Sequence, residues 1–308
     1  MPIPPLPPRV AFALRDGAAS TGDLLAAGIG DDEVRHLVST GALLRVRRAA
    51  FVDGTRYAGA SPDERYRLRV RAVLRARPGS AACHHAALAV RGLPLWGNDL
   101  RRIDLVSPAG GDNRVSGVVI YPLPDLPLET GGAWASVPVP YAALQVAIRA
   151  GRAAGVTAMD AATHSGACTL QDLAEMIPRF VRRIQLSAML ALVDPQCESV
   201  GESRTRLLLH DLGLSFRTQV RIDDGEGFIG RVDFLLEGGV VVEFDGMVKY
   251  DGAGGRAALV AEKQRESRLV AAGFEVVRLI WADLDDPEHV LHLIRRAQRR
   301  AAVRRGLR

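Results

Sequence analysis

The chain has 308 residues, which is enough for about two domains with separate cores. Its 48% hydrophobic content and mean hydropathy of +0.06 exclude a disordered chain. No run approaches the roughly 20 apolar residues of a membrane span, and the opening residues lack the charged and apolar regions of a signal peptide. We therefore expect a cytoplasmic protein without membrane contact. The formal net charge of +5 permits nucleic-acid binding without requiring it.

Lysine is rare in this chain. The 40 basic residues include two lysines, Lys249 and Lys263, and both follow closely after Glu243-Phe244-Asp245. A lysine retained in an arginine-rich composition suggests a need for a compact ammonium group that can lose its proton, which a guanidinium cannot do. The pair therefore indicates catalysis, and the alternative is that two lysines cluster by chance.

Residues 1–57 predict a small helical domain that ends in a hairpin. One short helix follows Ser20, a second begins at Asp31 and stops at Gly41, and an alternating arginine-rich strand comes next. This is the order of a winged helix-turn-helix, in which the second helix reads DNA and the wing contacts phosphates. The alternative is a domain that mediates only protein contacts. The nucleic-acid-binding candidates are Arg35, His36, Ser39, Thr40, Arg45, Arg47 and Arg48.

Residues 58–197 predict a mostly helical region with a short β element. The adjacent His84 and His85 could act as metal ligands or as a base. We identify no carboxylate or cysteine at ligand spacing from them, which favours a helix-end cap or a core pair. The arginines between residues 65 and 77 are typical of a solvated helix face, with phosphate contact as the alternative.

Residues 198–308 predict a helix, a strand, a β-hairpin, a second helix and a final strand. The second helix allows a parallel crossover and therefore a mixed sheet with helices packed on it. Within the hairpin, a turn centred on Gly238 places Asp233 opposite Glu243. Asp245 projects from the same face because side chains alternate along a strand.

Three carboxylates at one point repel one another unless a cation neutralises them. Oxygen ligands suit Mg²⁺, or alternatively Mn²⁺, and we expect the metal ligands to be Asp233, Glu243 and Asp245. The helix after the hairpin is expected to turn Lys263 and Glu266 inward and to leave Arg265 solvated. In the alternative, Lys263 forms only a structural ion pair with Glu266 or a hairpin acid.

Glu202 has two interpretations. As the fourth residue of Ser199-x-x-Glu202 it matches a capping box, in which its carboxylate returns to the Ser199 amide. In the functional interpretation, Glu202 completes the acidic cluster from the helix that packs beside the hairpin.

Four segments between Glu202 and Trp281 carry a resemblance: GRVDF, VVVEFDGMVKY, EKQRESRL and GFEVVRLIW. They resemble the PD-(D/E)XK nuclease superfamily and, more narrowly, very-short-patch-repair-like endonuclease domains. The resemblance implies a restriction-endonuclease-like fold and a metal held by Asp233 and Glu243. The superfamily's usual basic residue two places after the second acid is replaced by Asp245, and Lys249 stands where the repair-like branch has a histidine. This implies Lys249, with Lys263, as the basic group.

The whole chain is also similar to AbiEi-type antitoxins, more weakly over its N-terminal two thirds. That similarity implies a promoter-binding regulator with a vestigial nuclease-like domain, partnered by DNA and by a cognate toxin or a second copy of the chain. The leading expectation is a magnesium-dependent endonuclease that hydrolyses DNA phosphodiesters. The alternatives are this non-catalytic regulator and an adaptor that binds only proteins.

Overall fold

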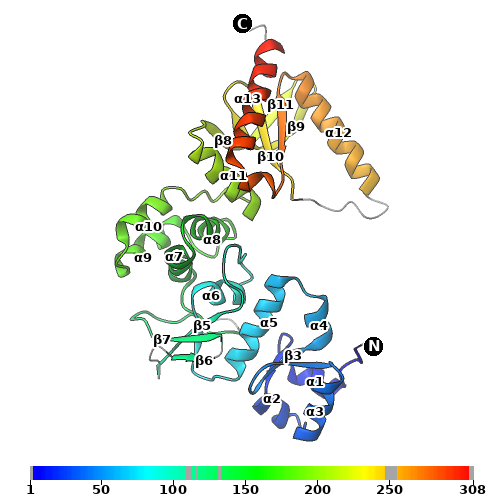
Figure 1. The fold of residues 1–308 in the computed structure, drawn as a ribbon, viewed down its shortest axis with the longest axis vertical. Helices are drawn as coiled ribbons and strands as arrows, with labels where there is room; N and C mark the ends of the chain where they lie inside the picture. The colour runs from blue at the N-terminus through cyan, green and yellow to red at the C-terminus, as the bar shows by residue number, and fades with distance from the viewer. Residues whose placement is uncertain (1–2, 109–112, 116, 131–132, 247–254, 305–308) are drawn as a thin grey trace. The chain divides into compact units, whose positions relative to one another are not determined.

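The computed structural model describes residues 3–108, 113–115, 117–130, 133–246 and 255–304. These residues form helices and three small sheets, which confirms a mixed α+β architecture (Figure 1). The chain divides into two compact units, 1–191 and 192–308, called unit 1 and unit 2 below. Within the described ranges, none of the helices has both the length and the apolar character that a membrane crossing requires.

The first part of unit 1 is a three-stranded antiparallel sheet with order β1-β3-β2, surrounded by helices. Ser20 starts the helix predicted after it, because its hydroxyl accepts from the Asp23 amide at 3.1 Å while the Asp23 carboxylate accepts from the Ser20 amide at 2.7 Å. The elements are α1 (Pro8–Ala13), β1 (Ala18–Ser20), α2 (Thr21–Ala26), α3 (Asp31–Ser39), β2 (Leu43–Arg47), β3 (Ala50–Asp53), α4 (Gly54–Gly59) and α5 (Pro62–Arg75).

The second part of unit 1 is a sheet of order β4-β5-β7-β6, in which β5 and β7 are parallel, followed by a group of helices. Helix α5 joins the two parts, since it packs against β1 and β3 and also against α6. The Tyr66 hydroxyl on α5 donates to the Arg102 carbonyl at 2.8 Å. The elements are β4 (Ala81–Ala82), α6 (His84–Val90), β5 (Ile103–Ser107), β6 (Asn113–Val115), β7 (Val118–Pro122), α7 (Val139–Ala150), α8 (Arg152–His164), α9 (Leu170–Met176), the 3₁₀ helix η1 (Ile177–Arg179) and α10 (Arg183–Leu190).

Unit 2 is a four-stranded mixed sheet with order β11-β10-β9-β8. Strands β8, β9 and β10 are antiparallel neighbours, and β11 lies parallel to β10 after the connection through α12, as the sequence predicts. The elements are α11 (Val200–Asp211), β8 (Phe216–Asp224), β9 (Gly227–Leu236), β10 (Val240–Phe244), α12 (Gly255–Ala271), β11 (Glu275–Leu279), the 3₁₀ helix η2 (Asp283–Asp285) and α13 (Pro287–Arg304).

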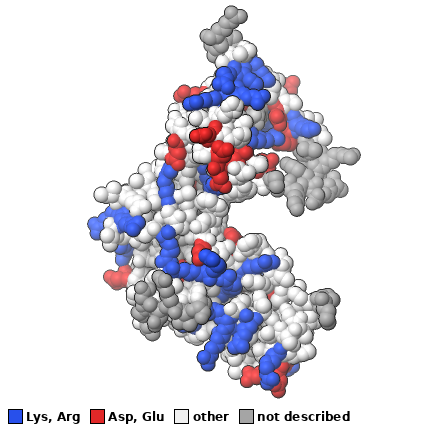
Figure 2. Space-filling view, viewed as in Figure 1, with Lys and Arg blue, Asp and Glu red and all other residues white. Residues whose placement is uncertain are grey.

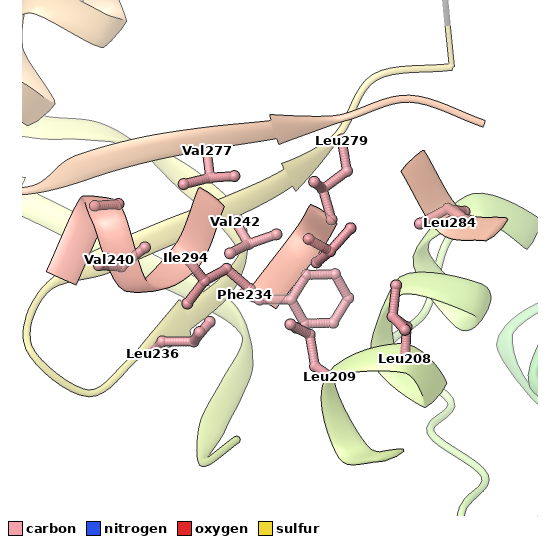
Figure 3. Close-up of a cluster of buried hydrophobic side chains, with 12 residues drawn as sticks. Leu208, Leu209, Phe234, Leu236, Val240, Val242, Val277, Leu279, Leu284 and Ile294 are labelled. Carbon is pink, nitrogen blue, oxygen red and sulfur yellow. The ribbon is translucent and has the colours of Figure 1, made fainter. Parts of the chain in front are cut away.

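The two faces of this sheet have separate cores. On one face Phe234, Val242 and Leu279 pack with residues of α11 and α13, as Figure 3 shows. On the other face Val241 packs with Leu269 of α12. Because side chains alternate along β10, Glu243 projects from the same face as Val241 and lies on the α12 side.

Helix α11 approaches the sheet closely at Gly201. A Cβ atom built at this position would lie 1.9 Å from Cε1 of Phe244, so only glycine allows the helix to lie against the end of β10. This contact fixes the height of the next residue, Glu202, above the strands.

We predict that Gly201→Ala lowers the free energy of unfolding of unit 2 by about 1–3 kcal/mol, because the methyl group forces the helix or the Phe244 ring to move. Urea unfolding of the full chain, followed by tryptophan fluorescence, measures this loss. The control is Gly225→Ala, where a Cβ atom has no neighbour within 4 Å. Equal stability of the two variants would contradict the packing described.

Candidate functional site

Asp233 and Glu243 lie side by side on the α12 face of unit 2. Strands β9 and β10 pair Leu236 with Val240 and Phe234 with Val242, so the next position in the register sets Asp233 opposite Glu243. The hairpin turn predicted at Gly238 therefore gives the predicted register. The oxygen Oδ2 of Asp233 also accepts a hydrogen bond from the Phe244 amide at 2.9 Å, which holds the carboxylate across the end of β10.

Three carboxylates interact at this point. The pKa of Asp233 is raised from 3.8 to about 6, first by burial and further by the charges of Glu202 and Glu243. The Phe244 amide and Arg265 oppose this rise. The charged form of the Asp233 carboxyl is therefore disfavoured, as expected where carboxylates lie together in a partly buried site.

Arg265 of α12 neutralises Glu243, and this corrects the expectation that Arg265 is a solvated residue. Its Nη2 atom lies 2.8 Å from Oε1 and 2.7 Å from Oε2 of Glu243, whose side chain is only 12% exposed. The pKa of Arg265 is raised, chiefly by its hydrogen bonds to Glu262 and next by those to Glu243. The sequence reasoning missed this cation because it assigned the opposite face of the helix to the core.

Lys263 does not face the site. Its residue is exposed on α12, while the buried stripe of the helix contains Leu269 with the half-buried Glu262 and Arg265. The predicted inward orientation of Lys263 is therefore wrong. Glu266 is half-buried and pairs with Arg278 of β11 at 3.0 Å rather than with Lys263. Leu269 lies about one helical turn from Arg265 and about two turns from Glu262, so the three residues share one face of α12.

Glu202 is buried, with 8% of the residue exposed. Ser199 caps α11 as predicted by accepting from the Glu202 amide at 3.1 Å. The Glu202 carboxylate, however, accepts from the Glu198 amide at 3.0 Å and from the Gln219 side chain at 2.8 Å, so it serves the preceding turn and the sheet instead of the Ser199 amide. Its charge also acts on Asp233, which places it with the acidic cluster.

Gln219 was not identified from the sequence. It lies in the middle of β8 with φ of +51°, a left-handed conformation that is unusual for a residue other than glycine. Its amide donates to Glu202. Backbone strain of about 1–3 kcal/mol persists only where the surroundings over-determine it, and such positions concentrate at functional sites.

The remaining predicted residues of the acidic hairpin lie at its end. Asp245 is exposed, and its amide donates to the Leu279 carbonyl at 2.8 Å. Lys249 lies outside the described residues. Asp233 and Glu243 with Glu202 therefore form the site that the structure brings together, with Arg265 as its cation.

The donors suit a hard cation such as Mg²⁺ by their chemistry, since they are carboxylates. Within the described ranges, however, no group of three or more histidine, cysteine, aspartate or glutamate residues is arranged to hold a metal. Both oxygens of Glu243 are bound by Arg265, and one oxygen of Asp233 and one of Glu202 accept from protein donors. A metal at Glu243 would therefore compete with Arg265 for the same oxygens, and metal binding stays a prediction.

The predicted DNA-binding residues of unit 1 occupy α3 and the β2–β3 hairpin. Arg35, His36 and Ser39 are exposed in the later turns of α3, whereas Thr40 is half-buried and its hydroxyl donates to the Leu37 carbonyl at 3.1 Å. Arg35 also pairs with Asp32. Three acids begin α3, so phosphate is disfavoured at that end and the later turns are the surface available for DNA.

The hairpin arginines differ in exposure. Arg45 and Arg48 are exposed, and Arg45 lies over the Phe51 ring at 5.9 Å, while Arg47 is half-buried. Arg35, Ser39 and Arg45 line one cavity of about 490 Å³ between α2, α3 and the hairpin. The sequence therefore brings three of its seven candidates to a common surface.

His84 and His85 belong to a buried polar cluster. Nδ1 of His84 lies 3.2 Å from Sγ of Cys83, and Nδ1 of His85 lies 3.5 Å from Oδ2 of Asp104, which is fully buried. Burial, followed by the positive charge of Arg149, lowers the pKa of His84 to about 3. The prediction of a core pair is confirmed for the burial of both histidines, and the nearby carboxylate was missed because Asp104 is distant in sequence.

Comparisons with known proteins add no family. No protein-family model matches the chain, and no curated protein matches it.

We predict that Asp233→Asn stabilises unit 2 at neutral pH. The folded state holds the Asp233 proton up to about pH 6, whereas the unfolded carboxyl loses it near 3.8, so stability falls as pH rises through this window. Asparagine removes that fall while its side-chain oxygen can still accept from the Phe244 amide. The expected gain at pH 7 is about 1–3 kcal/mol.

Urea unfolding at pH 4 and pH 7 measures this gain, and Asp245→Asn, at an exposed position, is the matched control. A gain at pH 7 that is absent for Asp245→Asn is expected. Lower stability of Asp233→Asn than of the wild type at both pH values would contradict the claim that ionised Asp233 destabilises the folded state.

Proposed function

We propose that this protein is a cytoplasmic DNA-binding protein in which unit 2 hydrolyses DNA phosphodiesters with a divalent metal, Mg²⁺ or Mn²⁺. The observation that carries the proposal is the placement of Asp233 beside Glu243 across β9 and β10, with the buried Glu202 of α11 acting on Asp233 and the pKa of Asp233 raised. Gathering buried acids costs stability, and proteins retain such costs at functional sites. The sequence resemblance to PD-(D/E)XK nucleases supports a restriction-endonuclease-like fold and this chemistry.

The residues of the site have separate roles in this proposal. Asp233 and Glu243 hold the metal, with Asp245 at the exposed rim as an additional ligand, and the metal supplies Lewis-acid activation of phosphate and water. Glu202 acts through its charge and through Gln219, which fixes its orientation. Arg265, whose guanidinium contacts Glu243, stabilises charge that develops on the phosphate. Lys249 remains the proposed ammonium, and Lys263 is assigned no role.

Unit 1 supplies DNA recognition. Helices α2 and α3 and the β2–β3 hairpin follow the order of a winged helix-turn-helix, with the exposed Arg35 and His36 facing bases and Arg45 and Arg48 contacting phosphates. Basic side chains cover more of the face of unit 1 in Figure 2 than acidic ones do, which is the electrostatic requirement for such binding.

A second candidate is a DNA-binding regulator or AbiEi-type antitoxin without cleavage, acting with a cognate toxin or as a homodimer. The double engagement of Glu243 by Arg265 favours it, because that carboxylate already has its counter-charge. This candidate predicts DNA binding that is independent of metal.

We predict that Asp233→Ala abolishes nicking of supercoiled plasmid in Mg²⁺ or Mn²⁺ and leaves duplex binding in place. Loss of the ligand removes about 4 kcal/mol of transition-state stabilisation, or roughly a thousand-fold in rate. Calorimetric titration of Mg²⁺ into the wild type and Glu243→Gln is the companion measurement. Undiminished nicking by Asp233→Ala would refute the site, and no metal heat in either protein would support the regulator.

We predict that Arg265→Gln lowers the cleavage rate by about 100-fold and at the same time strengthens metal binding, because it removes a phosphate-stabilising charge and frees the Glu243 oxygens. Lys263→Gln, two residues away and exposed, is the matched control and should match the wild type in both measurements. Equal loss in the two variants would assign the effect to general helix charge rather than to Arg265.

A further inference from the structure

An arginine-lined cavity of about 300 Å³ lies in unit 1, away from the residues assigned to base recognition. Arg47 comes from β2, Arg69 from α5 and Arg101 from the segment before β5, and apolar lining is provided by Val73 and Ile103. The cavity therefore joins the β2–β3 hairpin to the second part of the unit. Arginines from three distant parts of the sequence therefore line it.

The positive charges at this cavity are close enough to act on one another. Burial lowers the pKa of Arg47, and the nearby positive charges of Arg77 and Arg69 lower it further. Arg69 donates to the Leu100 carbonyl at 2.8 Å and lies 5.6 Å from the Tyr66 ring, contacts that hold its guanidinium without cancelling its charge. Arg101 is exposed and pairs with Asp99 at 2.9 Å.

Three other arginines of α5 have acidic partners. Arg75 pairs with Asp23, and Arg67 and Arg71 both pair with Glu64, at 3.4 and 3.8 Å. The helix thus distributes its arginines between two roles. Arg75 holds α5 to α2 through the Asp23 carboxylate, and Arg67 and Arg71 pair within α5, whereas Arg69 lines a cavity where the nearby charges that act on Arg47 are cations.

We propose that this cavity binds a phosphate group of the DNA backbone. Guanidinium groups present several N–H donors in a planar arrangement that matches phosphate oxygens, and a dianionic or monoanionic ligand relieves the repulsion between Arg47 and Arg69. The same hairpin carries the exposed Arg45 and Arg48, so a bound strand would run from the hairpin to α5 and β5. A small soluble phosphate has the same chemistry and is the other source.

This inference rests on the proposed function for DNA binding by unit 1 and is independent of cleavage by unit 2. It extends the DNA-contacting surface beyond residues 1–57, to Arg69 and Arg101. Experiments in a chelator, where cleavage is prevented, keep the two claims apart.

The test is duplex binding by the full-length chain, measured by fluorescence anisotropy in EDTA over a range of NaCl concentrations. The variants are Arg69→Gln and Arg47→Gln, and Arg182→Gln at the exposed start of α10 is the control that loses the same charge. Each phosphate contact contributes about 0.9 to the slope of log affinity against log salt. We expect each cavity variant to reduce the slope by about 1 and the control to leave it unchanged.

Arg69→Lys separates a binding role from a folding role. It keeps the charge and loses the planar donors, so it should retain the salt slope while binding several-fold more weakly. Circular dichroism melts show whether each variant is folded. If Arg69→Gln is unfolded, the test rests on Arg47→Gln. Slopes equal to that of the control in both cavity variants, or no duplex binding by the wild type, would overturn the inference.

A second arm distinguishes the source of the phosphate. Inorganic phosphate is titrated into the wild type and Arg69→Gln by calorimetry in the same buffer. Heat that depends on Arg69, together with an unchanged DNA salt slope, overturns the assignment to DNA and identifies a small phosphate as the ligand. A reduced slope with negligible phosphate heat supports the DNA backbone, whose neighbouring contacts strengthen a weak single site.

Discussion

The ion pair between Arg265 and Glu243 is the interaction on which unit 2 depends. It joins α12 to β10 where the Glu243 side chain is nearly buried, and an uncompensated charge there would cost several kcal/mol. Arg265 reaches this position across Gly230, where a Cβ atom would lie 3.1 Å from its Cδ atom. Glu262 holds the same guanidinium at 2.9 Å. The acidic face of the sheet can therefore exist without a metal, because the fold provides a cation.

The Arg265 guanidinium neutralises Glu243 but not Asp233. Arg265 contacts both oxygens of Glu243, while Asp233 receives only a weak opposing influence from it and has a pKa of about 6. The negative charge of Glu243 is thus compensated, whereas that of Asp233 is not. In the proposed function, a divalent cation would compete at Glu243 with a guanidinium that is always charged. A metal can displace Arg265 only if it binds the site more tightly when Glu243 is released than when Glu243 is paired, because a ligand shifts an equilibrium by the difference in its affinity for the two states.

The sequence predicted the parts of this site that depend on local periodicity. A three-residue turn at Gly238 and the two-residue period of strands were sufficient to set Asp233 beside Glu243. The orientation of α12 could not be obtained in the same way, because charged residues occur on several of its faces and apolar ones support more than one inward stripe. Gln219 and Asp104 act through partners distant in sequence, for which periodicity carries no signal.

The cation at the site is Arg265 and not the predicted Lys263, and this limits the chemistry that unit 2 can perform. A guanidinium stabilises negative charge and orients a phosphate, but it does not take a proton near neutral pH. Arg265 therefore cannot replace a lysine that accepts a proton from water. In a hydrolytic site built this way, proton transfer falls to a carboxylate or to Lys249. Asp233 is the carboxylate of this site whose pKa is raised, to about 6.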